Sequence, residues 1–187
     1  VGRDAMADHD TRYDRADDYL DLLYKLWETS WEEDAVLRDK AARLFADPAK
    51  IHEIRHDGPF YSSRGYHLSE PSPQRTPVLF QAGTSGRGQL FAARHAECVF
   101  ISASDPETAR RTSRKLREAV VAAGRRADDI RILVGLSVVT GESDALAQEK
   151  LDEYLRYSNP EAGLAHFAAG SGIDFSRYGL DDEITYG

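Results

Sequence analysis

The sequence lacks the features of exported, membrane-spanning and nucleic-acid-binding proteins. It has one cysteine, Cys98, in 187 residues, so no internal disulfide can form and a reducing cytoplasm is the expected location. Apolar runs stay well below the ~20 residues that cross a bilayer, and the start has no basic segment followed by an apolar one. The formal net charge of -8, with acidic residues spread throughout, argues against nucleic acid or a membrane as partner.

What the sequence does contain is the composition of a folded protein. Hydrophobic residues make up 41% and aromatic residues 10% of the chain, which is enough apolar surface for a core. We treat residues 1–187 as one partial domain, because the chain starts at Val1 without an initiator methionine and ends abruptly at Gly187. The sequence is therefore expected to be part of a longer protein.

The first regular pattern is helical. Between Tyr13 and Trp27, apolar residues recur every three or four positions, which predicts an amphipathic helix. Residues 31–75 are irregular and are interrupted at Asp47-Pro48 and Gly58-Pro59. We interpret them as a long excursion with one or two short helices.

The middle of the chain alternates between apolar runs and helical patterns. The predicted strands are residues 77–82, 98–102 and 130–140, and the helices that follow them are 90–95, 105–123 and 143–157. Apolar strands that alternate with helices predict an α/β fold with a parallel sheet covered on both sides. Residues 158–187 lack a periodic pattern and are expected to be an insertion or a loop segment.

A glycine-rich turn joins the first of these strands to its helix. Its residues are Gly83, Thr84, Ser85, Gly86, Arg87 and Gly88. The glycines let the backbone approach a ligand, the two hydroxyls can donate, and a helix N-terminus offers free N–H groups and a partial positive charge. Arg87 either adds a charge-assisted bond or faces solvent. The turn is a candidate phosphate site, and an ordinary tight turn between strand and helix is the alternative.

The spacing of this turn excludes two common phosphate loops. Gln89 and Leu90 stand where a P-loop has Lys and Ser or Thr, so the contacts to triphosphate and magnesium are missing. The glycine order also differs from the dinucleotide fingerprint, and a suitable acidic residue about 20 positions later is lacking. The turn is therefore neither an NTPase loop nor a dinucleotide-binding loop.

The segment His52-Glu53-Ile54-Arg55-His56 spells the zinc-peptidase pattern His-Glu-x-x-His. On a helix this pattern would place both imidazoles on one face. Gly58-Pro59 would end such a helix just after the second histidine, and His67, Glu70 and His95 lack the spacing of a third ligand. We expect no metal site here and interpret the two histidines as surface residues, with a zinc hydrolase as the less favoured alternative.

Four segments resemble one known family. They are His9-Asp10-Thr11-Arg12-Tyr13, then Ala16-Asp17-Asp18-Tyr19, then Leu23-Tyr24-Lys25-Leu26-Trp27-Glu28, and the run from Glu70 to Ser85 that contains Gln81-Ala82-Gly83-Thr84-Ser85. In these segments the chain resembles the bacterial luciferase-like flavin monooxygenases. More narrowly, it resembles the branch with nitrilotriacetate monooxygenase component A, long-chain alkane monooxygenase and dibenzothiophene-sulfone monooxygenase.

The resemblance implies a fold and a set of cofactor contacts. It implies part of a (β/α)₈ TIM barrel, about strands five to seven with their helices, with the excursion before the fifth strand. It implies FMN as cofactor, in its reduced form as a co-substrate. The FMN-binding residues that it implies are His9, Tyr13, Ala82, Gly83, Thr84 and Ser85.

The implied chemistry is that of a two-component flavin monooxygenase. A separate flavin reductase would supply reduced FMN, which reacts with O₂ to oxygenate a small organic substrate, while the protein binds, orients and excludes water. The resemblance identifies neither the substrate nor a catalytic residue, and we expect a homo-oligomer. A non-catalytic module that binds a phosphate ligand remains an alternative.

Overall fold

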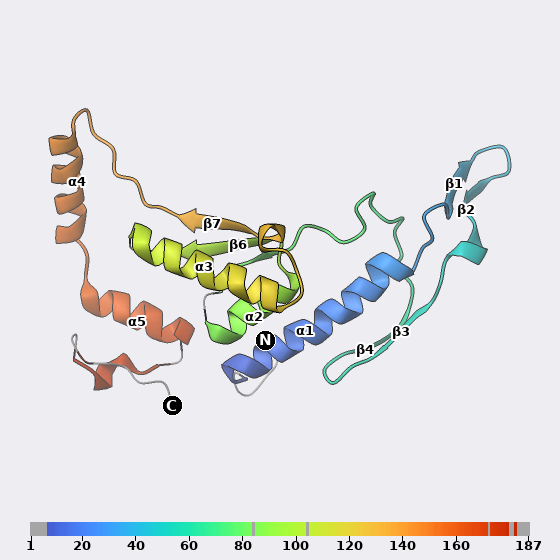
Figure 1. Ribbon diagram of the computed structural model, residues 1–187, viewed down its shortest axis with the longest axis horizontal. Coiled ribbons are helices and arrows are strands. Elements are labelled where there is room, and N and C mark those ends of the chain that lie inside the picture. The colour runs from blue at the N-terminus through green and yellow to red at the C-terminus, as the bar shows by residue number, and fades with distance from the viewer. Residues whose placement is uncertain (1–6, 84, 104, 172, 180–181, 183–187) are drawn as a thin grey trace. The chain divides into compact units, whose positions relative to one another are not determined.

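The structure is a computed structural model that describes residues 7–83, 85–103, 105–171, 173–179 and 182 (Figure 1). The chain divides into two compact units, Val1–Leu136 and Ser137–Gly187, and each is considered by itself. In the described part of the chain, no helix has both the length and the apolar character needed to cross a bilayer.

The first unit opens with the predicted amphipathic helix. Helix α1 spans His9–Tyr24 and continues through a π-helical turn, Lys25–Thr29. It starts four residues before the predicted Tyr13 because the carboxylate of Asp8 accepts the N–H of Thr11 at 2.9 Å and caps the helix. The early start places His9 and Tyr13 one turn apart at the N-terminal end of α1.

The excursion contains one short helix, the 3-10 turn Pro48–Lys50, in agreement with the prediction, and two antiparallel hairpins that were not predicted. The hairpins pair β1 (Val36–Asp39) with β2 (Leu44–Ala46), and β3 (Ile54–Asp57) with β4 (Ser62–Gly65). In β3, Ile54 and His56 are buried while Arg55 and Asp57 are exposed. This period of two residues is typical of a strand.

A three-stranded parallel sheet follows, which confirms the α/β class. Its order is β5 (Phe80–Gln81), β6 (Cys98–Ser102) and β7 (Arg131–Gly135). Two strands are shorter than predicted. β5 has only two of the expected six residues, and β7 ends at Gly135, after which Leu136 and Val138 are exposed.

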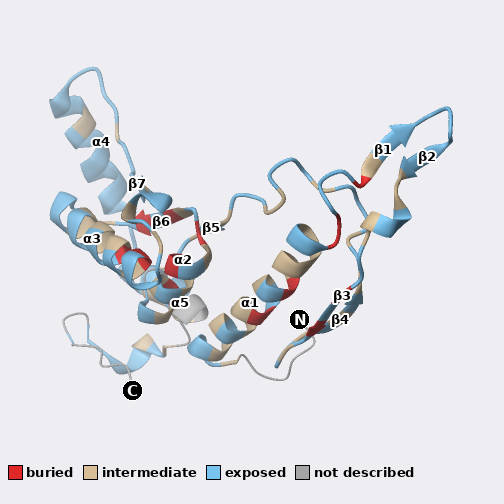
Figure 2. Cartoon of the chain, turned by 45° about the vertical axis from the view of Figure 1, so that its right-hand side comes forward, coloured by how far each residue is buried: buried red, intermediate tan, exposed pale blue. Residues whose placement is uncertain are grey.

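Two helices cover one face of this sheet. They are α2 (Gly86–His95) and α3 (Pro106–Ala122), and the buried residues lie where these helices meet β6 (Figure 2). The core consists of Ala92, Ala93, Ala96, Val99, Ile101, Leu116, Val120 and Ile130. The alanines of α2 allow close helix packing, and the guanidinium of Arg125 donates to the carbonyls of Ala93 and Ala96 at the end of that helix.

The other face of the sheet is exposed, so the prediction of a sheet covered on both sides is wrong for the described residues. Phe80 and Phe100 lie on it, 58% and 47% exposed, with their rings stacked at 5.9 Å. They come from neighbouring strands, and Phe100 is in register with Leu133 of β7. The sheet thus presents a row of apolar side chains without a layer against it among the described elements.

The second unit contains the predicted helix α4 (Asp144–Arg156), capped by Ser143, and a further helix, α5 (Pro160–Ser171). Helix α5 shows that residues 160–171 are not a loop, which was one of the two alternatives expected for residues 158–187. Asn159 starts it by accepting the N–H groups of Glu161 and Ala162. Its small and apolar residues follow no helical rhythm, which is why the pattern did not reveal it.

Candidate functional site

The glycine-rich turn is the N-terminus of helix α2. The hydroxyl of Ser85 accepts the N–H of Gly88 at 3.1 Å, so the helix begins at Gly86 rather than near Leu90 as predicted. The N–H groups of Gly86 and Arg87 have no acceptor within the helix, and they add to the positive end of its dipole. This is the backbone geometry of an anion site. Thr84 lies outside the described residues.

Tyr13 of α1 reaches across to this turn. Its hydroxyl would lie 2.6 Å from a Cβ added at Gly83 and 2.6 Å from one added at Gly88. Its ring contacts Phe91 of α2 at 5.5 Å between centroids. Two of the three glycines are therefore needed to make room for Tyr13, whereas a Cβ at Gly86 would meet nothing within 4 Å.

Gln81 belongs to the same group of side chains, although it was not among the predicted site residues. Its Nε2 donates to the hydroxyl of Tyr13 at 3.3 Å. Its Oε1 is fully buried and has no hydrogen-bond partner among the described residues. In the sequence, Gln81 is the polar residue after the apolar run from Pro77 to Phe80 and the first residue of the motif shared with the family.

The remaining predicted site residues lie beside Tyr13 or in the turn. The ring of His9 packs edge-on against Tyr13 at 5.1 Å, and its Nδ1 lies 2.7 Å from the carboxylate of Asp10. Ala82 is exposed just after β5, and Gly83 follows it. The structure thus places His9, Tyr13 and the turn at one end of α1 and α2.

Arg87 does not face solvent, and its charge-assisted bonds go to carboxylates of its own chain. Its guanidinium donates to the carboxylate of Asp14 at 2.8 Å and to that of Asp17, both on α1. It also lies over the ring of Tyr13, 5.6 Å from the centroid. Asp14 is the main cause that raises the pKa of Arg87. The charge of Arg87 is therefore used within the protein, where it holds α1 against α2.

Asp17 is the centre of this ion cluster. Besides Arg87, its carboxylate contacts His95 Nε2 at 2.7 Å and Arg94 at 3.3 Å, and His95 Nδ1 lies 3.0 Å from the hydroxyl of Tyr24. Burial by itself would raise the pKa of Asp17, but the bonds from Arg87 and His95 outweigh it and the pKa is lowered. The cluster fixes the position of Tyr13 relative to the turn.

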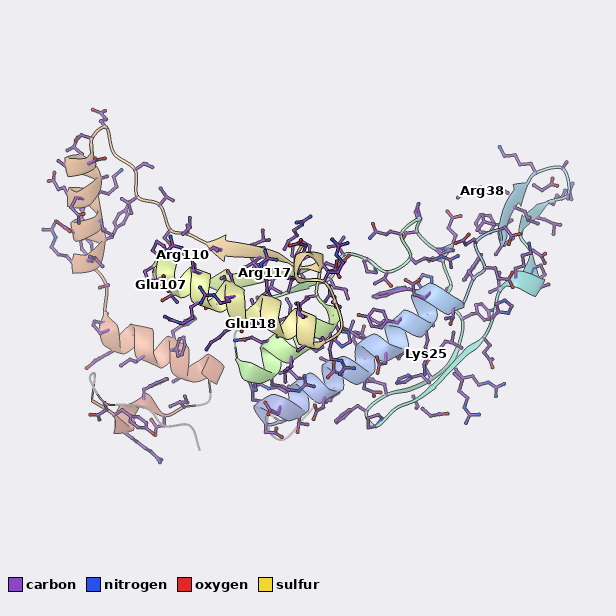
Figure 3. The ribbon with its side chains drawn as sticks, in the orientation of Figure 1. Lys25, Arg38, Glu107, Arg110, Arg117 and Glu118 are labelled. Carbon is purple, nitrogen blue, oxygen red and sulfur yellow. The ribbon has the colours of Figure 1, made fainter. Side chains whose placement is uncertain are left out.

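The His-Glu-x-x-His pattern lies on and before a strand, so the helix that a zinc site would need is absent. His52 contacts Glu32 at 2.7 Å, while His56 is buried, with its Nε2 2.8 Å from Asp18 and its Nδ1 3.2 Å from Lys25. Lys25 belongs to the turn that continues α1 (Figure 3). The interpretation of His56 as a surface residue is wrong, because the strand alternation turns it inward. Among the described residues, no three His, Cys, Asp or Glu side chains form a metal-binding group.

We expect metal analysis to agree with this geometry. The full-length protein should contain no stoichiometric zinc, because both histidines have carboxylate partners from their own chain. Metal emission spectroscopy of the purified protein and of His52→Ala measures this. If the unmutated protein contained one zinc per chain and His52→Ala had lost it, the result would favour the zinc hydrolase alternative.

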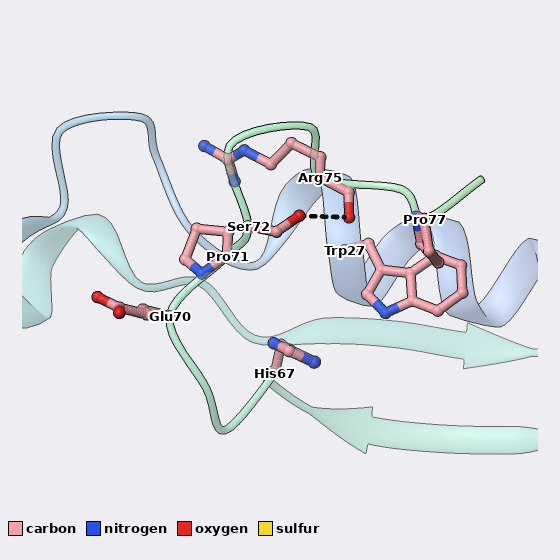
Figure 4. Close-up of a pocket in the computed structure, with 7 residues that line it drawn as sticks. All are labelled: Trp27, His67, Glu70, Pro71, Ser72, Arg75 and Pro77. Atoms are coloured by element: carbon pink, nitrogen blue, oxygen red, sulfur yellow. Dashed lines mark hydrogen bonds between the residues drawn. The ribbon is translucent and has the colours of Figure 1, made fainter.

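A surface pocket lies in another part of the first unit, where the excursion returns toward β5 (Figure 4). Its polar groups are engaged by the chain itself: Glu70 accepts from Arg38, and Arg75 donates to the carbonyl of Trp31. None of the predicted site residues contributes to it. The lining residues are Trp27, His67, Glu70, Pro71, Ser72, Arg75 and Pro77.

Comparison with known proteins gives consistent matches over nearly the whole chain. Residues 1–183 match the family model described as luciferase-like monooxygenase. The chain is 49% identical to dimethyl-sulfide monooxygenase of Hyphomicrobium sulfonivorans, over 98% of this chain and 38% of that protein. It is 46% identical to long-chain alkane monooxygenase of Geobacillus thermodenitrificans, over 96% of this chain and 41% of that protein.

Solved structures of related proteins also match the chain over nearly its whole length and with high similarity. The crystal structure of long-chain alkane monooxygenase superposes with a TM-score of 0.88 at 46% identity, covering 98% of this chain and 42% of that one. A riboflavin lyase, solved with modified FMN and its substrate riboflavin, superposes with a TM-score of 0.85 at 44% identity, covering 94% of this chain and 39% of that one. The chain spans about two fifths of the length of these relatives.

Proposed function

The chain belongs to the luciferase-like monooxygenase family, and from this premise we propose that the whole protein is an FMN-dependent monooxygenase of a two-component system. A separate flavin reductase would supply reduced FMN, and O₂ and a small organic molecule would be the other substrates. The observation that carries the proposal is the hydroxyl of Tyr13 at the glycine-rich N-terminus of α2. It creates a group of hydrogen-bond donors suited to a phosphate.

We also propose that β5, β6 and β7 are the fifth to seventh strands of a (β/α)₈ barrel. Their parallel order and the helices on one face support this proposal. In such a barrel the exposed row with Phe80 and Phe100 would face the interior, against strands outside this chain. The glycine-rich turn would then lie at the C-terminal face of the barrel, where ligands bind.

The residues at the turn fit the phosphate end of FMN. Gly83 and Gly88 leave no side chain between Tyr13 and the backbone, and the first N–H groups of α2 can donate to phosphate oxygens. The Tyr13 hydroxyl accepts from Gln81, which leaves its own proton available to an acceptor. We propose that His9, Tyr13, Ala82, Gly83, Thr84 and Ser85 hold the cofactor, with the role of Thr84 resting on the sequence.

When bound, reduced FMN would activate O₂, and the residues of this chain would hold the cofactor in place through polar contacts. Tyr13 donates to the phosphate, while the Asp17 cluster holds its helix in place. Ser85 caps α2 by accepting the N–H of Gly88, and the N–H groups of Gly86 and Arg87 can then donate to the ligand. His9, beside Tyr13 and about half exposed, is placed for a polar contact with the cofactor.

The proposal is tested on the full-length protein. With FMN, NADH and a flavin reductase under air, we expect product from a panel of small sulfides, sulfones and alkanes, and none when oxygen or the protein is left out. Equilibrium titration with FMN gives the more direct result. Absence of FMN binding would overturn the proposed function.

The hydroxyls of the turn give a further prediction. Replacing Thr84 and Ser85 together by alanine should weaken FMN binding by ~1–3 kcal/mol, because hydrogen bonds to a charged group are lost. Isothermal titration of FMN measures the change. Ser143→Ala is the matched control, since it removes the N-cap hydroxyl of α4 at a similar cost in helix stability. Unchanged affinity in the double variant would refute the assigned site.

A further inference from the structure

The side-chain amide of Gln81 is only half satisfied. Its Nε2 donates to the hydroxyl of Tyr13 at 3.3 Å, while its Oε1 is fully buried without a partner among the described residues. A buried carbonyl oxygen without a donor is costly, and native structures pair such atoms with protein, water or ligand. The oxygen therefore marks a place where a donor from outside the described chain is expected.

The hydrogen bond to Tyr13 fixes which way the amide and the hydroxyl are directed. Because the Tyr13 oxygen accepts from Gln81, its proton is free to donate outward, as a phosphate ligand requires. If the amide were turned around, the Tyr13 hydroxyl would donate its proton to Gln81 Oε1. The Nε2 group would then be the one without a partner. The arrangement with Nε2 on Tyr13 thus offers one donor and one acceptor side by side.

These two groups call for a ligand with complementary chemistry. A phosphate dianion only accepts hydrogen bonds, so it can pair with Tyr13 but cannot satisfy Gln81 Oε1. Gln81 lies against the phosphate turn, since its Nε2 would be 2.5 Å from a Cβ added at Gly83. A donor for Oε1 would therefore lie close to the phosphate, as a group on the part of the ligand that joins the phosphate would.

We propose that Gln81 is a specificity-determining residue whose Oε1 accepts a hydrogen bond from the ribityl hydroxyl of FMN next to the phosphate. The inference rests on the proposed function and adds to it: the site recognises a hydroxyl and a phosphate together. Gln81 then accepts a hydrogen bond from the hydroxyl, and Tyr13 donates one to the phosphate.

The test measures equilibrium binding to the full-length protein through flavin fluorescence, with oxidised FMN and 4′-deoxy-FMN as the two probes. The unmutated protein should bind FMN at least ~10-fold more tightly, the size expected for a lost bond to a buried acceptor. In Gln81→Met the two probes should bind within about 2-fold of each other. Gln74→Met, the same change at an exposed glutamine, should keep the preference of the unmutated protein.

Equal binding of the two probes by the unmutated protein would overturn the inference, and this result does not depend on whether a variant folds. A preference that persists in Gln81→Met would also overturn it, because the hydroxyl would then bind elsewhere and a water molecule would satisfy Gln81. In both cases FMN still binds and the proposed function stands. Absence of binding by either probe would instead remove the proposed function together with the inference.

Discussion

Replacing Gly88 by alanine is expected to weaken FMN binding at least ~10-fold, the equivalent of ~1.4 kcal/mol. The new Cβ would lie 2.6 Å from the hydroxyl of Tyr13 and 2.9 Å from that of Ser85. Both hydroxyls would have to move, and Tyr13 has little freedom because Gln81, Phe91 and Arg87 surround it. Titration of the full-length variant with FMN measures the effect.

Gly86→Ala is the matched control for this clash. Both glycines lie in the first turn of α2, and alanine improves helix propensity at either by up to ~1 kcal/mol. A Cβ at Gly86 meets nothing within 4 Å, so that variant should unfold at a higher temperature than the unmutated protein. Gly88→Ala should show no such gain. If Gly88→Ala gained as much stability and bound FMN normally, Tyr13 would not occupy the place described.

Asp18→Asn is expected to destabilise the full-length protein, lowering its Tm by on the order of 5 °C. Asp18 is 6% exposed, and its carboxylate accepts the N–H groups of Phe60 and Tyr61 at 2.9 and 2.8 Å and contacts His56. An amide lacks the charge and turns an N–H₂ group toward one of these partners. Thermal unfolding measures the loss, with Asp21→Asn, an exposed residue of the same helix, as the control that should change little.

The pH dependence of this loss follows from the pKa of Asp18. Burial by itself would raise it, but the two backbone N–H groups and His56 outweigh burial, so the pKa in the folded protein is lowered. The stabilisation is therefore fully present above the unfolded pKa of about 3.9 and disappears as the pH falls through the folded value. The Tm difference between the unmutated protein and Asp18→Asn should shrink as the pH falls below about 4. A difference that grew over this acidic range would contradict the account.

Local patterns predicted the parts of the fold that are determined locally. The apolar rhythm after Tyr13 gave α1, and Asp105-Pro106 gave the start of α3, since capping and periodicity involve neighbours in sequence. The hairpins of the excursion were missed because their strands have three or four residues each. Such short strands are held by pairing and by contacts to α1 rather than by propensity.

The candidate site divides in the same way. The residues of the turn from Gly83 to Gly88 predicted an anion site, and the family resemblance added Tyr13. Arg87 was misjudged because its partners, Asp14 and Asp17, precede it by about 70 residues. The role of Gln81 was missed for the same reason, because its hydrogen bond to Tyr13 and the burial of its Oε1 arise only in the folded chain.

His56 shows the same limit for a motif. Read along the sequence, it completes a zinc pattern, yet in the fold it is the buried partner of Asp18. Gly58 explains the close fit, because a Cβ there would lie 1.8 Å from the Asp18 carboxylate. The identity of a residue and the spacing of its neighbours left both roles open, and only the packing of β3 against α1 decides between them.

The affinity of the full-length protein for FMN relative to riboflavin tests the central claim most directly, because the two ligands differ only in the phosphate. Donation from Tyr13 and from the first turn of α2 to a charged group predicts that FMN binds at least ~100-fold more tightly, or ~2.7 kcal/mol. The preference should fall in Gly88→Ala, where the Tyr13 hydroxyl is displaced. Equal affinity for FMN and riboflavin would contradict the assignment of the glycine-rich turn as the phosphate site.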